Sequence, residues 1–297
     1  MRHAILGAGG VGGFVGAVLA AAGEQVTLLV RRESYASHPR TLKLESPLGN
    51  LSAPVTLAAV LGRPVDVLWV TTKATQLEAA LATVPYPERA SCVVPLLNGI
   101  DHVGRLRSQF GNERVIPATI AAELERSGPG HIVHRSSFVR FGFAAAGQAA
   151  LAKPVEQLVA FGCTTTFEAD ERTLLWRKLV LLAPMALNTT AAGRNVGGLR
   201  GDPEWARRFE QAVGEACAVA VAEGAKIDVK KTLETLQTFP DSLKSSMQKD
   251  VEAGRPPELD AIGGPILRGA ARHGIEVPVT GELMEAISYR LSATRGR

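Results

Sequence analysis

Cysteine, aromatic residues, net charge and long apolar runs are all scarce in this sequence. Cys92, Cys163 and Cys217 lie far apart, with no CxxC pair and no histidine at metal-ligand spacing beside them. An odd number of scattered cysteines favours reduced thiols in a cytosolic protein over a disulfide framework or a zinc site. We therefore expect a functional site without a metal.

The charge pattern argues against nucleic acid and membrane partners. The 33 Lys+Arg exceed the 29 Asp+Glu by only four, the basic residues are scattered, and aromatic residues make up 5% of the chain. A nucleic-acid surface would gather basic and aromatic side chains, and a membrane span would need about 18 apolar residues in a row. The first predicted strand begins almost at Met1, so we expect no leader and a cytoplasmic protein. The 297 residues, 46% of them hydrophobic, suggest a globular chain of about two domains.

The strongest positive signal is a glycine motif at the N-terminus. An apolar run over His3–Leu6 meets Gly7-x-Gly9-x-x-Gly12, and an Ala-rich helical pattern follows over 11–22. In a strand–loop–helix unit, Gly7 allows the tight turn, Gly9 lets the backbone approach a pyrophosphate, and Gly12 lets the helix pack closely on the strand. The helix N-terminus presents N–H groups to the anion. The motif predicts dinucleotide binding, with an ordinary Gly-rich turn as the alternative.

The strand after this helix ends in two arginines. A site specific for NAD would place Asp or Glu there to accept a hydrogen bond from the ribose 2′-hydroxyl, but this chain has Arg31-Arg32. A guanidinium suits a 2′-phosphate, so NADP (as NADPH) is the favoured cofactor. The alternative is a solvated basic pair that closes the strand.

Strands and helices then alternate, which predicts a Rossmann-type parallel sheet with right-handed crossovers. Lys73 follows one buried strand and Asn98 the next, and ligands of such sheets bind at the carboxyl ends of strands. A surface lysine and an ordinary Asn-Gly turn are the alternatives. The predicted strands are 42–45, 50–57, 66–70, 91–97, 115–120, 131–134, 138–143 and 163–167; the predicted helices are 75–84, 101–110 and 149–161; and 128–130 is a predicted hairpin turn.

Two histidines in the later strands form no convincing metal pair. His131 and His134 are three apart in a predicted strand, so their side chains point to opposite faces. We expect both to lie on the surface of the sheet. The N-terminal cofactor domain is predicted to span residues 1–168.

The remainder of the chain, 169–297, is predicted to be an all-helical domain that carries the substrate and catalytic groups. The expected helices are 171–191, kinked at Pro184, and 203–223, 229–236, 241–253, 258–273 and 280–292. Lys178 lies on an apolar face of the first of them. A lysine there either snorkels to water or has a lowered pKa suited to a proton donor.

Two further polar residues are candidates. Ser246 could donate a hydrogen bond to a substrate carboxylate, or it could cap or interrupt a helix. Glu258 follows Pro256-Pro257 and fits the first helical turn, where the helix dipole favours the ionised carboxylate.

Taken together, these motifs resemble the ketopantoate reductase (2-dehydropantoate 2-reductase) family over essentially the full length and in the family's order. The segments that carry the resemblance are Gly7-x-Gly9-x-x-Gly12, Arg31, Thr72-Lys73-Ala74, Leu97-Asn98-Gly99, Trp176-Arg-Lys178-Leu179, and Ser245-Ser-Met247 before Glu258. The resemblance implies that NADPH gives a hydride to the keto carbon of a 2-oxo acid such as 2-dehydropantoate.

The resemblance also implies a role for each residue. Lys178 would protonate the developing alkoxide, Glu258 would hold the distal hydroxyl of the substrate, and Ser246 its carboxylate. Lys73 and Asn98 would line the junction of cofactor and substrate, and the protein could form a homodimer.

One departure concerns the helix of Lys178. The family presents asparagines one and two turns later, where this chain has Leu182 and Ala186, and Asn188 is expected to face elsewhere. The pocket is therefore expected to be more apolar, and the identity of the substrate is left undetermined. The rival interpretations are a related dehydrogenase that acts on another keto or β-hydroxy acid, and a non-catalytic NADP-binding sensor.

Overall fold

The computed structural model describes residues 1–295 and divides the chain into two compact units. The first unit comprises Met1–Leu97 and His102–Leu174, and the second comprises Asn98–Asp101 and the chain from Leu175 onward. The boundary between the units, at Leu174 and Leu175, therefore falls inside a helix. The short segment Asn98–Asp101, which follows a strand of the first unit, belongs to the second unit.

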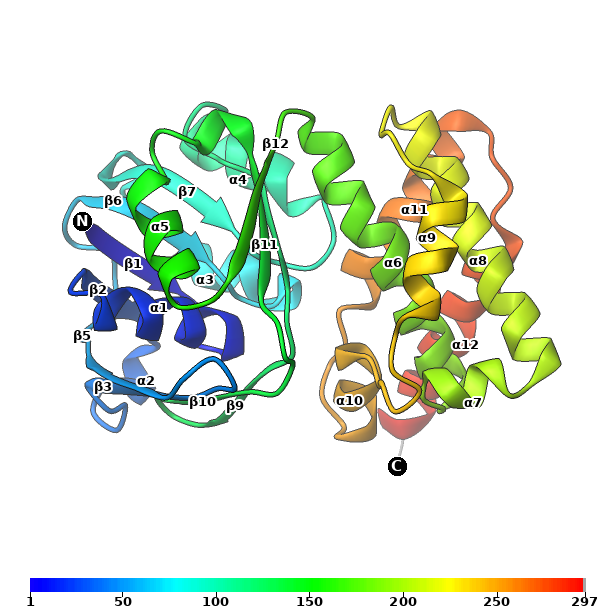
Figure 1. Cartoon of the computed structure of the whole chain (residues 1–297), viewed down its shortest axis with the longest axis horizontal. Coiled ribbons are helices and arrows are strands. Elements are labelled where there is room, and N and C mark those ends of the chain that lie inside the picture. Colours follow the sequence, from blue (N-terminus) through cyan, green and yellow to red (C-terminus); the bar gives the residue numbers. More distant parts are fainter. Residues whose placement is uncertain (296–297) are drawn as a thin grey trace. The chain divides into compact units, whose positions relative to one another are not determined.

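A five-stranded parallel sheet forms the centre of the first unit (Figure 1). Its strands are β1 (Arg2–Leu6), β2 (Gln25–Leu29), β5 (Thr56–Ala58), β6 (Val65–Val70) and β7 (Ala90–Pro95), in the order β5-β2-β1-β6-β7. The chain proceeds from β1 to one edge and then to the other, which is the doubly wound order of a Rossmann-type sheet. The predicted fold class is confirmed.

Helix α1 (Gly10–Ala21) contacts this sheet and also a second, four-stranded sheet, and small residues make both contacts close. A Cβ at Gly12 would lie 2.7 Å from Ile5 of the parallel sheet, and one at Gly13 would lie 2.5 Å from Ile132 of the second sheet. The second sheet has the order β4-β3-β10-β9, with β3 at Thr41–Glu45, β4 at Leu51–Pro54, β9 at Leu124–Gly128 and β10 at His131–His134. The apolar character of α1 therefore reflects burial on two sides.

One predicted strand was wrong, and one strand was not predicted. The predicted strand 50–57 is two strands, because β4 pairs with β3 in the second sheet whereas β5 pairs with β2 in the main sheet. Strand β9 was missed, although it pairs with β10 through the predicted hairpin turn, which is confirmed. A third sheet of order β12-β11-β8 contains β8 (Ala118–Ala121), β11 (Arg140–Ala144) and β12 (Thr164–Glu168).

Short helices complete the first unit, and its core is continuous. The helices are α2 (Arg32–Tyr35), α3 (Leu77–Leu81), α4 (His102–Phe110) and α5 (Ala152–Ala160), with 3₁₀ turns at Ala74–Gln76, Pro87–Arg89 and Ala145–Gly147. The core joins Phe14 of α1 to Trp69 of β6 and Phe141 of β11. His134 belongs to this interior, contrary to prediction: it is buried and contacts the hydroxyls of Ser46 and Ser136.

The second unit is helical throughout its described part, as predicted. Its helices are α6 (Glu171–Ala192, which begins in the first unit), α7 (Val196–Arg200), α8 (Pro203–Ala222), α9 (Val229–Gln237), α10 (Ser246–Glu252), α11 (Leu259–His273) and α12 (Pro278–Arg295). Helix α6 continues through Pro184. Its buried residues Trp176, Val180 and Ala183 join a core of their own with α8 and α11.

The predicted helix 241–253 was too long at its N-terminal side. The carbonyls of Asp241 and Leu243 accept hydrogen bonds from the N–H groups of Gly197 and Val196 at the start of α7. These long-range bonds hold 241–243 outside the helix, and α10 begins only at Ser246.

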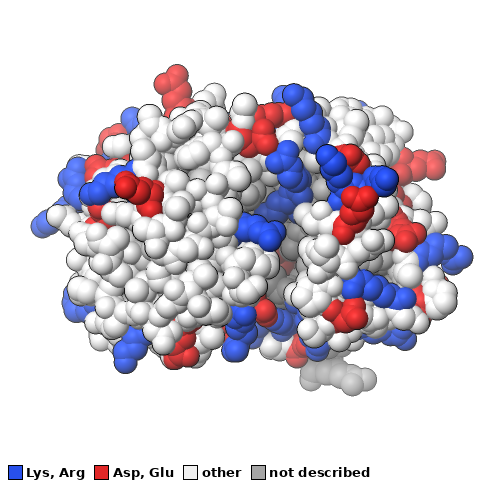
Figure 2. Space-filling view, in the orientation of Figure 1, with Lys and Arg blue, Asp and Glu red and all other residues white. Residues whose placement is uncertain are grey.

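The surface agrees with the scattered charges of the sequence. On the face shown in Figure 2, basic and acidic side chains are interspersed. Among residues 1–295, no helix combines the length and the apolarity that crossing a bilayer requires. The three cysteines are buried, free thiols.

Candidate functional site

The glycine loop between β1 and α1 has the geometry that its motif predicts. Gly7 has a φ of 106°, and a Cβ on it would lie 2.7 Å from the backbone nitrogen of Thr72. A Cβ on Gly12 would collide with the carbonyl oxygen of Gly7 and the hydroxyl of Thr71. That hydroxyl donates to the Gly7 carbonyl at 2.8 Å, which fixes the turn.

Gly9 presents open space in front of the helix. Within residues 1–295, no heavy atom lies within 4 Å of a Cβ built on it, and no side chain caps α1. The first turn of an α-helix leaves N–H groups without intrahelical partners, and these attract anions. The open backbone at Gly9 and the uncapped start of α1 therefore fit a pyrophosphate.

The carboxyl ends of the parallel strands lie level and carry the other predicted cofactor residues of the first unit. Leu6 pairs with Leu29 on one side and with Val70 on the other. Arg31 follows β2 and is exposed, and its guanidinium forms no ion pair with any residue in 1–295. Lys73 follows β6, is half-buried and precedes the 3₁₀ turn at Ala74. The structure thus brings the glycine loop, Arg31 and Lys73 to one edge of the sheet.

Three predicted residues of the second unit form one hydrogen-bonded chain. The Lys178 ammonium on α6 donates to Asn98 Oδ1 at 3.1 Å, and Asn98 Nδ2 donates to Glu258 Oε2 at 3.0 Å. An ammonium has only donors and a carboxylate only acceptors, so the Asn98 amide can bridge them in this orientation alone. The amide therefore couples the two ionisable groups and sets the direction of each hydrogen bond.

Burial perturbs the lysine of this hydrogen-bonded series. Desolvation lowers the pKa of Lys178 to about 8, and the nearby negative charge of Glu258 opposes part of that shift. Glu258 itself is buried, with 8% of its surface exposed. The lysine is thus charged near neutral pH yet releases its proton far more readily than an exposed lysine.

Ser245 and Ser246 have different environments, which the sequence did not predict. Ser245, not Ser246, caps α10: its hydroxyl accepts hydrogen bonds from the N–H of Gln248 at 3.0 Å and from the hydroxyl of Thr189 at 3.0 Å. Ser245 is buried, whereas Ser246 is exposed as the first residue of the helix. The helix cap thus falls on its neighbour, and the Ser246 hydroxyl is left at the surface.

Sequence reasoning missed two of these contacts. The pattern Ser245-x-x-Gln248 is the signature of a capping box and could have identified the cap. Nothing local could have linked Asn98 to Glu258, because 160 residues separate them. Glu258 precedes α11 by one residue instead of standing in its first turn, and its carbonyl accepts the Ile262 N–H.

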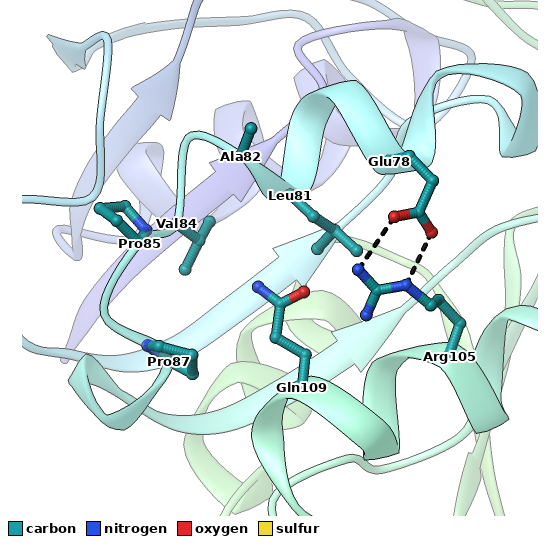
Figure 3. Close-up of a pocket in the computed structure, with 8 residues that line it drawn as sticks. All are labelled: Glu78, Leu81, Ala82, Val84, Pro85, Pro87, Arg105 and Gln109. Carbon is teal, nitrogen blue, oxygen red and sulfur yellow. Dashed lines mark hydrogen bonds and ion pairs between the residues drawn. The ribbon is translucent and has the colours of Figure 1, made fainter.

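A surface pocket elsewhere in the first unit contains none of the predicted site residues (Figure 3). Val84, Pro85 and Pro87 line it on the approach to β7, and the Arg105 guanidinium forms two hydrogen bonds with Glu78 at its side. Its lining offers neither a nucleophile nor a perturbed acid or base that points to chemistry. Among the described residues, no group of three or more His, Cys, Asp or Glu side chains could hold a metal ion.

Known proteins are similar to this chain over nearly its whole length. A family model described as "Ketopantoate reductase PanE/ApbA" matches residues 3–145, and one described as its C terminal matches residues 170–290. The 2-dehydropantoate 2-reductase of Caulobacter vibrioides is 31% identical over 294 residues, which cover 93% of this chain and 94% of that enzyme.

Solved structures share the fold over nearly the whole chain. A PanE/ApbA family ketopantoate reductase from Ralstonia eutropha superposes with a TM-score of 0.86 at 25% identity, covering 99% of this chain and all of its own. A D-mandelate dehydrogenase bound to NADH and anilino(oxo)acetate has a TM-score of 0.85 at 24% identity and covers 99% of both chains. The two family models cover most of this chain, which therefore belongs to the ketopantoate reductase family, whose members are oxidoreductases acting on a CH–OH group.

Proposed function

We propose that this protein is an NADPH-dependent reductase that converts a 2-oxo acid such as 2-dehydropantoate into the corresponding 2-hydroxy acid. The observation that carries the proposal is the chain Lys178–Asn98–Glu258, in which a lysine with a pKa of about 8 is held by an amide against a buried carboxylate. Reduction of a ketone by hydride requires a proton at the oxygen, and a lysine of this pKa can supply it near neutral pH.

The residues of the first unit fit a bound dinucleotide. The open backbone at Gly9, the close packing at Gly7 and Gly12, and the uncapped start of α1 suit the pyrophosphate. The guanidinium of Arg31, which has no ion-pair partner among the described residues, suits the 2′-phosphate of NADPH, since a charge-assisted hydrogen bond to a phosphate is strong. Lys73 at the next strand end would line the nicotinamide side.

The residues of the second unit would manage charge and proton. When bound, the reduced nicotinamide supplies the hydride. Lys178 would donate its proton to the oxygen that becomes the hydroxyl, where a cation stabilises the developing negative charge. Asn98 would hold the ammonium in place and orient Glu258, whose carboxylate would accept from a hydroxyl of the substrate. Ser246 would donate to the carboxylate of the substrate.

The identity of the 2-oxo acid is a separate proposal. Leu182, half-buried one helical turn after Lys178, is an apolar neighbour for a substrate side chain. A neighbour in structure, the D-mandelate dehydrogenase, was solved with anilino(oxo)acetate, which joins an aromatic ring through an amide to a carboxylate and so resembles an aromatic 2-oxo acid in shape. A 2-oxo acid with an apolar side chain is accordingly the second candidate beside 2-dehydropantoate.

The decisive experiment is consumption of NADPH and of NADH against a panel of 2-oxo acids, with 2-dehydropantoate and aromatic 2-oxo acids included. The proposal expects turnover with NADPH and at least one member of the panel, and loss of about 10²-fold or more in Lys178→Ala. Readier oxidation of β-hydroxy acids would favour the rival dehydrogenase, and cofactor binding without turnover would favour a sensor. The homodimer stays a prediction, to be tested by light scattering.

A further inference from the structure

The segment Asn98–Asp101 follows a strand of the first unit but is attached to the start of α11. Asn98 donates to Glu258, as described above. Ile100 packs against the core of the second unit. The last residue of the segment, Asp101, accepts a hydrogen bond from the Arg268 guanidinium. The segment is thus held at both of its ends.

Between its two ends, the segment contacts α11 at a carbonyl that a proline in the helix leaves without its usual donor. Pro265 has no N–H, so the carbonyl of Ala261, four residues earlier, lacks its helical donor. Gly99 packs directly against that carbonyl, and a Cβ on Gly99 would collide with it. Gly99 also has a φ of 80°, which a residue with a side chain rarely adopts. The backbone of the segment at Gly99 therefore lies directly against the backbone of α11.

Arg268 spans two turns of α11 to reach its partners. Its Nη1 donates to Asp260 Oδ1 at 2.8 Å, while its Nη2 donates to Asp101. Residues 260, 264 and 268 share one face of the helix. The residue between is Gly264, where a Cβ would lie 2.5 Å from Arg268 Nη2 and would collide with the Asp260 carboxylate. The absence of a side chain at Gly264 lets the guanidinium lie flat over the helix.

We propose that Arg268 is a positioning residue that clamps the segment Asn98–Asp101 to the start of α11 and so holds Asn98 between Lys178 and Glu258. Two contacts join the segment 98–101 to the stretch 258–260. Asn98 contacts Glu258 at one end, and Arg268 links Asp101 to Asp260 at the other. Asp101 is three residues from Asn98, and Asp260 is two from Glu258. Release of the outer contact leaves the segment held by the packing of Gly99 and Ile100 and by the side-chain hydrogen bonds of Asn98.

The clamp acts on local placement and not on global stability. Arg268 is 43% exposed and its partners are more so, and exposed ion pairs contribute little to the free energy of unfolding. Catalysis is more sensitive, since displacement of a catalytic group by about 1 Å can cost far more in rate than in stability. Loss of Arg268 should therefore lower turnover without lowering the melting temperature.

The first test compares Arg268→Ala with Arg272→Ala, one turn later on the same helix. Arg272, itself 55% exposed, also forms an ion pair, with the half-buried Glu223 at 2.7 Å, but does not touch the segment. We expect Arg268→Ala to lower kcat about three- to tenfold, with KM for NADPH within about twofold. Amide hydrogen exchange of 98–101 should become faster, and Arg268→Lys should restore part of kcat because it keeps one ion pair. Arg272→Ala should behave as the wild type.

The second test uses Gly264→Ala. Alanine in place of glycine inside a helix ordinarily stabilises it. Here the added methyl group would displace only the ends of the Asp260 and Arg268 side chains. We expect a melting temperature equal to or above that of the wild type, together with faster exchange at 98–101 and a lower kcat. A merely structural glycine would show activity and stability falling together.

The inference rests on the proposed reductase function for its effect on kcat but not for its effect on exchange. If no 2-oxo acid is reduced by the wild type, the proposed function fails, while exchange at 98–101 still decides whether the clamp exists. Equal exchange in Arg268→Ala and Arg272→Ala overturns the clamp. A lower kcat without faster exchange overturns it too, because the loss would then arise elsewhere.

Discussion

The rate of reduction should fall with rising pH around the pKa of Lys178. Burial lowers this pKa to about 8, whereas an exposed lysine titrates at about 10.4. The general acid works only in its protonated form, so the rate is full below the pKa and is lost above it. With a pKa of about 8, roughly nine in ten Lys178 side chains are protonated at pH ~7 and roughly one in ten at pH ~9.

Above its midpoint the rate should fall about tenfold for each pH unit. The assay is single-turnover oxidation of bound NADPH with saturating 2-oxo acid, because product release can mask chemistry in steady-state kcat. The affinity for NADPH, measured over the same pH range, controls for loss of cofactor. A rate that stays level up to pH ~10 would refute the reasoning, since the acid would then have the pKa of an ordinary lysine.

Glu258→Gln sharpens this test because it removes charge and keeps the hydrogen bond. The Gln oxygen can still accept from Asn98 Nδ2, but the negative charge that raises the pKa of Lys178 is gone. The pH above which the rate of reduction falls should therefore be lower than in the wild type. An unchanged pH, or a higher one, would show that Glu258 does not act on Lys178 through its charge.

Four other substitutions test separate parts of the proposal. Arg31→Ala should weaken NADPH binding by about 1.5 to 3 kcal/mol and leave NADH nearly unaffected, measured by calorimetry; equal losses would exclude the 2′-phosphate contact. Lys178→Ala should lower single-turnover rates by about 10²-fold while the NADPH dissociation constant holds. Ser245→Ala should reduce unfolding free energy by about 0.5 to 2 kcal/mol in urea melts, as a helix cap does. Ser246→Ala should instead raise KM for the 2-oxo acid with stability unchanged, and the reverse pattern would assign the substrate contact to Ser245.

Local patterns in the sequence predicted the elements whose stability is local or strongly apolar. The parallel strands β1, β6 and β7 are nearly continuous apolar runs, and the glycine spacing places the turn before α1. Strand β9 failed this criterion because Glu125, Arg126 and Ser127 are exposed polar residues at the edge of their sheet. Its only signal is pairing with β10, which is a property of the fold and not of the segment.

Some residues of the candidate site could likewise be identified from local sequence, and others could not. Lys178 could be identified because a lysine on an apolar helical face is conspicuous, and Arg31 because it replaces an expected acid. The role of Asn98 could not be read locally, since Asn-Gly is also an ordinary turn sequence. Its assignment depends on an ammonium on one side and a carboxylate on the other, both of them brought there by the helices of the second unit.

The structure also narrows the departure from the family pattern on α6. Ala186 has no exposed surface and lies in the core of the second unit, so it offers no atom to a substrate in this arrangement. Asn188 is equally buried, and its amide donates to the Pro184 carbonyl of its own helix at 2.9 Å. Of the two positions where the family has asparagine, 182 and 186, only Leu182 keeps accessible surface. The polarity that α6 presents near Lys178 is therefore set by Leu182, and an amide restored there, not at Ala186, is the change that would alter preference between hydroxylated and apolar 2-oxo acids.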